Sequence, residues 1–130
     1  MKQISTFMLS ILLLGVFSLP ASADIPIDQM KKILNMTKNS WVSFRDFNGK
    51  QMIYFTHLEA YTCGIKEVHY SINTEELDQR WELQPCKTTH PNTIRKDIIY
   101  LTMPLATAKS IAVQVTFTDG TKSEIVRKNP

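Results

Sequence analysis

Short stretches of alternating apolar and polar residues, separated by turn signals, run through the chain from Trp41 onward. The clearest is residues 111–117. Successive side chains of an extended strand point to opposite faces, so an alternating stretch buries one face and exposes the other. The pattern predicts a strand with Ile111, Val113, Val115 and Phe117 inward and with Ala112, Gln114 and Thr116 outward.

Six further segments have the composition of strands: residues 41–47, 52–58, 65–73, 80–84, 97–105 and 122–128. Asn48-Gly49 separates the first two, and Asn-Gly between such stretches is the strongest short hairpin signal because both turn residues take positive φ. Pro104 cannot donate to a ladder, so it marks a strand end or an edge strand. About seven short strands at regular spacing predict a mainly β fold, an antiparallel β-sandwich rather than an α/β fold.

Residues 24–40 differ from the strand region that follows. Met30, Ile33 and Leu34 recur at helical spacing, and Asp28 is suited to cap the helix start. The alternatives are a partner-binding helix and a membrane-surface helix. Because the apolar stripe is narrow, we instead expect a short helical or extended flap that packs onto the domain. The predicted organisation is therefore a leader at 1–23, an N-terminal flap at 24–40 and a β-sandwich domain at 41–130.

The first 23 residues have the three parts of a secretory signal peptide. Lys2 supplies the basic start, residues 4–19 are almost wholly apolar, and Ala21-Ser22-Ala23 forms a small-residue cleavage site. The alternative is an uncleaved membrane anchor, but the apolar stretch is slightly short of the about 20 residues that a span needs. We predict cleavage before Asp24, export to the periplasm or outside the cell, and no membrane association afterwards.

The chain has two cysteines, Cys63 and Cys86. In an oxidising compartment the two thiols of a small domain usually pair, and such a bond would stabilise the fold by about 3 kcal/mol. A redox-active pair and a pair of metal ligands are the alternatives. Neither cysteine lies in a C-x-x-C motif or in a Cys/His cluster with zinc-finger spacing, so we predict a structural disulfide.

Two segments carry a resemblance to a known class of module. Gly64–Asn73 (GIKEVHYSIN) resembles a strand and turn of bacterial immunoglobulin-like or fibronectin III-like modules, and Val113–Thr121 (VQVTFTDGT) is similar to their closing hairpin. The resemblance covers Trp41–Lys128 at the level of pattern and departs from antibody domains in its short Cys-to-Cys separation. It implies an immunoglobulin-like sandwich of about seven strands. Such modules serve adhesion, carbohydrate binding, chaperoning or spacing, so the fold does not select a function.

Charge and motifs exclude several functions. The net charge of +3 becomes +2 when Lys2 is removed, and the basic residues are scattered, which argues against nucleic-acid binding. The G-x-S-x-G elbow, the phosphate-binding G-x-x-x-x-G-K-[ST] loop and the H-E-x-x-H motif are absent. We therefore expect a protein that is not an enzyme and that needs no cofactor.

His57 and His69 are the candidate metal ligands. If the strands around them form a hairpin through residues 61–64, the two histidines lie nearly opposite each other, about 5 Å apart at Cβ. Glu59 and Glu67 would be the adjacent carboxylates. The alternative is a polar, solvent-facing strand surface, because a closed metal site needs about four ligands.

Aromatic residues offer a second candidate site. Tyr54, Tyr61, Tyr70, Trp81 and Tyr100 would suit a stacking surface for sugars or an aromatic-rich protein interface. Most aromatic side chains in so small a domain belong to the core. The candidate ligand surface is therefore limited to Trp41, Tyr61 and Trp81, which are near strand ends or loops.

The leading functional hypothesis is a small exported binding or accessory module of the cell envelope, without catalysis. Its partner would be another envelope or secreted protein, because the edge strands of sandwiches can accept an added strand. One alternative is a carbohydrate-binding module that uses exposed aromatic residues. The other is a metal-binding protein or metalloenzyme built on His57 and His69.

Overall fold

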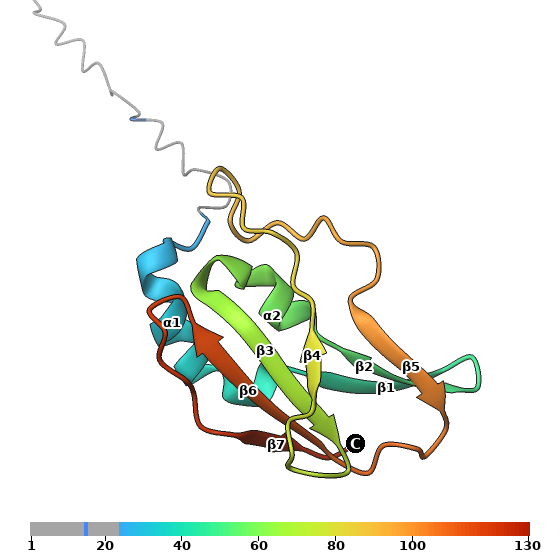
Figure 1. Cartoon of the computed structure of the whole chain (residues 1–130). Helices are drawn as coiled ribbons and strands as arrows, with labels where there is room; N and C mark the ends of the chain where they lie inside the picture. Colours follow the sequence, from blue (N-terminus) through green and yellow to red (C-terminus); the bar gives the residue numbers. More distant parts are fainter. Residues whose placement is uncertain (1–14, 16–23) are drawn as a thin grey trace, which may run out of the picture.

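The computed structural model describes residue 15 and residues 24–130, so the predicted signal peptide at 1–23 lies outside the described residues apart from Gly15. The described part is mainly β, with seven strands in two antiparallel sheets and few helices (Figure 1). One sheet has the strand order β1-β2-β5 and the other has the order β4-β3-β6-β7. The prediction of a mainly β, sandwich-like fold is therefore confirmed.

The chain crosses between the two sheets as it adds successive strands. The three-stranded sheet contains β1 (Ser43–Phe47), β2 (Lys50–Tyr54) and β5 (Tyr100–Pro104). The four-stranded sheet contains β3 (Ile65–Ile72), β4 (Gln79–Trp81), β6 (Ile111–Phe117) and β7 (Val126–Lys128). The helical elements are α1 (Ile27–Met36), η1 (Lys38–Ser40), α2 (Thr56–Ala60) and η2 (Thr62–Gly64).

The core lies between the two sheets. Ile53 of β2 and Val68 of β3 are fully buried and belong to one apolar cluster. The four predicted inward residues of β6 are all buried in this cluster, which confirms the alternation. Ala112 and Thr116, predicted outward, are nevertheless only 2% and 8% exposed. They are small side chains on an inner strand, and longer neighbours such as Arg127, which is paired with Ala112, flank them.

The hairpin predicted from Asn48-Gly49 is present. Asn48 has φ 51° and Gly49 has φ 71°, as a two-residue turn of this kind requires. The turn pairs Phe47 with Lys50 and fixes the register of β1 on β2. It therefore decides which side chains of these strands face the core and which face away from it.

The predicted return strand at 52–58 is wrong beyond Tyr54. Phe55 extends the ladder by donating from its N–H to the carbonyl of Ile99, and then the chain turns into helix α2. Leu58 and Glu59 are adjacent in sequence and both fully buried, which a helix packed into a corner permits and a strand with one solvent-facing side does not.

Helix α1 buries the predicted stripe and packs against η2. Met30 and Leu34 are fully buried, and the carbonyl of Leu34 accepts a hydrogen bond from the Trp41 indole N–H. The predicted cap by Asp28 is not formed, because the helix starts directly after Pro26, whose fixed φ suits that position. Close approach to η2 is possible because position 64 is glycine.

We predict that Gly64→Ala destabilises the protein. A Cβ on Gly64 would lie 2.6 Å from the Cβ of Met30, so α1 would have to move away from η2. The expected loss is about 1–3 kcal/mol in the free energy of unfolding, measured by urea denaturation. Lys32→Ala, on the exposed face of the same helix, is the control and should change stability by less than about 0.5 kcal/mol. Equal effects of the two substitutions would contradict the packing argument.

Candidate functional site

The segment that links the two sheets, residues 82–99, is anchored at several points. Cys63 of η2 and Cys86 form a disulfide with a Cα–Cα distance of 4.7 Å, which confirms the predicted bond. Cys63 is buried, whereas Cys86 belongs to an exposed stretch. The bond therefore ties an exposed connection to the buried corner formed by α2 and η2.

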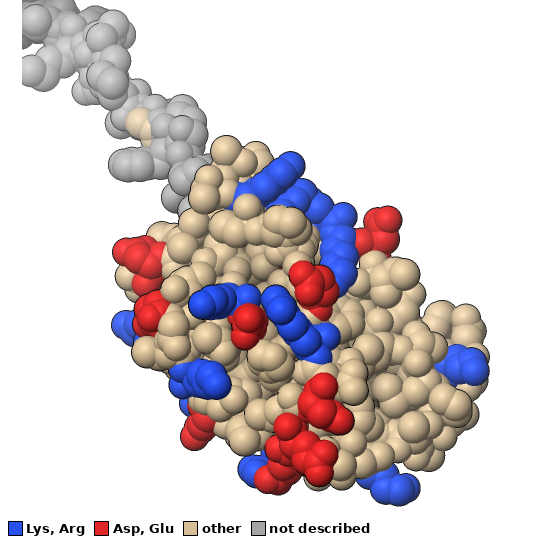
Figure 2. Space-filling model, in the orientation of Figure 1, with Lys and Arg blue, Asp and Glu red and all other residues tan. Residues whose placement is uncertain are grey.

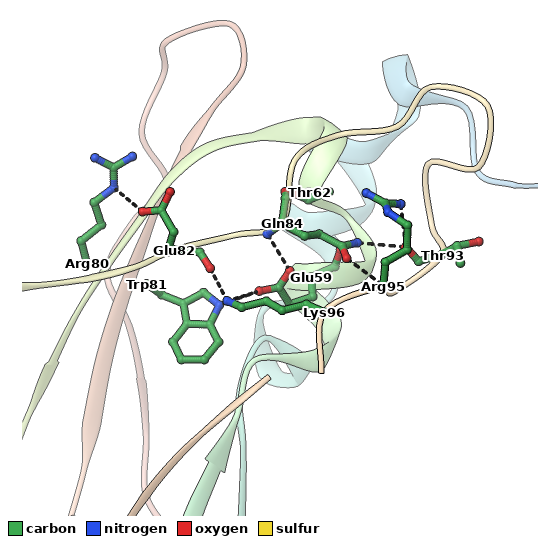
Figure 3. A network of polar contacts seen from close by, with 9 residues as sticks. All are labelled: Glu59, Thr62, Arg80, Trp81, Glu82, Gln84, Thr93, Arg95 and Lys96. Atoms are coloured by element: carbon green, nitrogen blue, oxygen red, sulfur yellow. Dashed lines mark hydrogen bonds and ion pairs between the residues drawn. The ribbon is translucent and has the colours of Figure 1, made fainter. Parts of the chain in front are cut away.

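A buried carboxylate provides the second anchor (Figure 3). The side chain of Glu59 on α2 is fully buried, and its oxygens accept hydrogen bonds from the Trp81 indole at 2.8 Å and from the Gln84 backbone N–H at 3.0 Å. The ammonium of Lys96 completes the set at 3.2 Å. Burial of a carboxylate is tolerated here because each oxygen has a hydrogen-bond partner and the charge has a counterion.

Gln84 connects the same corner to the next part of the segment. Its side-chain amide donates to the carbonyls of Glu59 at 3.3 Å and Thr93 at 2.9 Å, and its side-chain oxygen accepts from the backbone N–H of Arg95 at 2.8 Å. Its own carbonyl accepts from the Thr62 hydroxyl at 2.7 Å. Within residues 24–130, every buried side-chain nitrogen or oxygen has a hydrogen-bond partner, so the buried polar groups of this network are satisfied by contacts within the protein.

Two members of the predicted aromatic ligand surface are core residues. Trp81 is 8% exposed because it stacks on Phe55, with ring centroids 4.2 Å apart, and because the Lys96 ammonium lies 4.2 Å from its centroid. Trp41 is fully buried against α1. Tyr61 is half-buried beside His57, with ring centroids 4.9 Å apart. These aromatic residues therefore do not form one exposed surface.

The two candidate metal ligands are not opposite each other. His57 lies on α2, and its Nε2 is 2.9 Å from the hydroxyl of Thr37, which itself donates to the carbonyl of Ile33. His57 is therefore the donor in this contact. His69 lies on β3, paired with Arg80 on one side. The hairpin that would have joined the histidines is absent because residues 56–60 are helical.

A hollow of about 240 Å³ lies beside the disulfide, between the start of β3 and the segment after β4. Its charged lining includes Lys66, Glu67, Arg80 and Glu82, and Arg80 lies 4.0 Å from Glu67 and 3.9 Å from Glu82. The volume is below the about 300–1,000 Å³ of ordinary ligand pockets. Figure 2 shows the same mixture of signs over the face that it draws. This side of the molecule therefore has no single-sign field that would favour a strongly charged ligand.

The three-stranded sheet has an open edge at β5. The backbone N–H of Phe55 donates to the carbonyl of Ile99, which continues the register of β2 on β5. Hydrogen-bonded pairs alternate along an antiparallel ladder, so the backbone N–H and C=O groups of Tyr100 and Thr102 point away from β2. Apolar side chains flank this edge: Ile98 is 61% exposed and Leu105 is 52% exposed. The candidate functional site is therefore the outward-facing backbone of β5, which lies between the exposed side chains of Ile98 and Leu105.

Comparison with known proteins adds no assignment: no protein-family model, no curated protein and no solved structure matches the chain. Within residues 24–130, no group of three or more His, Cys, Asp or Glu residues is placed to hold a metal ion. None of the helices in that part is long and apolar enough to cross a membrane. Function is therefore inferred from the geometry of the sheet edge and its surroundings.

Only part of this site could be predicted from the amino-acid sequence. Pro104 correctly indicated a strand end or an edge, and it is the last residue of edge strand β5. The exposure of Ile98 and Leu105 has no clear local signature, because both belong to a stretch in which Thr102 is the one polar residue. The role of Glu59 was missed because the strand predicted for 52–58 placed it at a strand end in a connection rather than in a buried helix.

We predict that Glu59→Gln destabilises the protein. A glutamine amide has one accepting oxygen where the carboxylate has two, so a buried N–H of Trp81 or Gln84 would be left facing a second donor. The expected cost is about 1–3 kcal/mol in the free energy of unfolding. Glu82→Gln is the matched control, since Glu82 is exposed, and it should cost less than about 0.5 kcal/mol. Similar midpoints in urea denaturation would show that the network does not stabilise the fold.

We also predict that stability falls in mild acid because of His57. Burial lowers the pKa of His57 below its ordinary value of 6.5. The unfolded chain then binds more protons than the folded one between the two pKa values, so stability is full above pH 6.5 and declines as the pH drops toward the folded pKa. Denaturation curves from about pH 7 to about pH 5 should show this decline in the parent and a smaller one in His57→Gln. The same pH slope in both proteins would assign the effect to other groups.

Proposed function

We propose that the protein is an exported, non-catalytic binding or accessory module whose partner is another envelope or secreted protein. The partner contributes an extended segment that pairs with β5 as a further strand of the β1-β2-β5 sheet. The observation that carries this proposal is the open backbone of Tyr100 and Thr102 between the exposed Ile98 and Leu105. Backbone hydrogen bonds supply affinity in such complexes, and side-chain contacts supply specificity.

The other sheet edges suit this role less well. Strands β4 and β7 each have only three residues. Strand β1 has five, but it carries Arg45 and Asp46, and charged side chains on an edge discourage strand pairing. On β5, the core-facing Leu101 and Met103 remain only partly buried. An added strand would shield these side chains, so the hydrophobic effect favours pairing at β5.

Export and family resemblance are part of the same proposal. The Cys63–Cys86 disulfide fits a compartment outside the cytoplasm, and the leader at 1–23 would direct the chain there. Seven antiparallel strands in sheets of three and four support an immunoglobulin-like or fibronectin III-like module. The fourth strand here joins the sheet of β3, whereas in antibody constant domains it joins the first sheet.

We predict that Thr102→Pro abolishes partner binding and leaves the domain folded. Proline removes the central outward N–H of β5, which takes no part in the ladder with β2. Wild type, Thr102→Pro and Thr102→Val should be used as baits in the exported fraction of the source organism. A partner that is retained by wild type and Thr102→Val should be lost with Thr102→Pro.

Urea denaturation of the three baits checks that each one is folded. Thr102→Val keeps the backbone N–H and changes only the side chain, so it separates the contribution of the backbone N–H from that of the Thr102 side chain. Retention of the same partner by folded Thr102→Pro would contradict strand addition at β5. Loss with both variants would place the contact in the Thr102 side chain instead.

A further inference from the structure

The face of the three-stranded sheet that points away from the core carries two basic residues and no acidic one. Phe44, Ile53 and Leu101 face the core, so the alternate residues of each strand face outward. The outward residues are Ser43, Arg45 and Phe47 on β1, Lys50, Met52 and Tyr54 on β2, and Tyr100, Thr102 and Pro104 on β5.

The two cations on this face are without internal counterions. Across residues 24–130, neither Arg45 nor Lys50 forms an ion pair or a hydrogen bond from its side chain, and both are exposed. Five other basic residues do form ion pairs: Lys31, Lys38, Arg80, Lys96 and Arg127. Because this face also carries no acidic side chain of its own, its positive charge is left available to a partner.

The side chains around these charges suit a binding surface. The Arg45 guanidinium lies over the ring of Phe47, 4.2 Å from its centroid, which restrains the guanidinium and leaves its N–H groups free for a carboxylate. The rings of Tyr54 and Tyr100 lie 5.3 Å apart on the same face. Tyrosine and arginine are enriched among the residues that contribute most to protein interfaces.

We infer that the segment bound at β5 is acidic. This inference rests on the proposed strand addition and names the chemistry of the partner. Alternate side chains of an added strand would lie over the outer face, two strand spacings or about 10 Å from β2. A glutamate or aspartate there can extend toward Lys50, because the residue between them in register is Pro104, whose side chain is short. Arg45 is one strand further, about 15 Å away and beyond a Debye length of about 8–10 Å, so it adds a weaker, screened attraction of the same sign.

Peptide selection tests the inference. Random peptides about ten residues long, enough to cover a five-residue strand with its flanks, are displayed and selected on the purified, disulfide-bonded protein. Enrichment of Asp and Glu at alternate positions is expected. Affinity should fall about tenfold for Arg45→Glu/Lys50→Glu and by an intermediate amount for Arg45→Gln/Lys50→Gln. The matched control is Lys32→Glu/Lys122→Glu, which changes the net charge equally at exposed sites and should keep affinity within about twofold.

Three outcomes bear on this inference, and a fourth bears on both proposals. Selected peptides that lose affinity on Thr102→Pro but show no acidic enrichment would keep strand addition and overturn the acidic partner. Acidic peptides that bind the Arg45→Glu/Lys50→Glu variant as well as wild type would also overturn it. Binding of polygalacturonate that Thr102→Pro leaves unchanged would replace a peptide with an anionic polysaccharide. Selection of no peptide above background would overturn both proposals.

Discussion

The buried carboxylate of Glu59 is the contact on which the connection between the two sheets depends. It receives the Trp81 indole from the end of β4 and the Lys96 ammonium from just before β5. The chain between these two residues has no strand or helix of its own. A segment of that kind cannot position the next strand by itself, so the polar network and the disulfide fix where β5 begins.

This anchoring has a consequence for the candidate site. An exposed apolar edge is usually a liability, because it pairs with any available strand. Here β5 is held at one end by the anchored segment and by the Phe55–Ile99 hydrogen bond, and it ends at Pro104, which limits the length of the open edge. An edge that is already held in place loses little conformational entropy when a partner strand binds, which raises the affinity for a segment that fits it.

The sequence was informative where local chemistry decides structure. Asn48-Gly49, the alternation of residues 111–117 and the two cysteines all predicted features that are present. The prediction was wrong at residues 56–60, which continue a strand-like pattern but form a helix, because Phe55 and Leu58 pack into the core there. The candidate metal site depended on the wrongly predicted strand at 52–58. The candidate aromatic surface depended on an exposure that Trp41 and Trp81 do not have. Which side chains surround Trp81 is decided by residues distant in sequence, and no single-sequence pattern contains that information.

The charges around β4 differ from those on the outer face of the β1-β2-β5 sheet, and this difference favours binding of a partner at the three-stranded sheet. Around β4, positive and negative side chains are close enough to neutralise each other, as Arg80 does with Glu67 and Glu82. A charged partner segment of either sign would meet like charges as well as opposite ones there, so electrostatics contribute little to binding at this face. On the outer face of the β1-β2-β5 sheet, Arg45 is already oriented by Phe47 and has no acidic neighbour to give up. Binding of a carboxylate there adds an interaction without removing one, so electrostatics and the open backbone of β5 favour the same docking side.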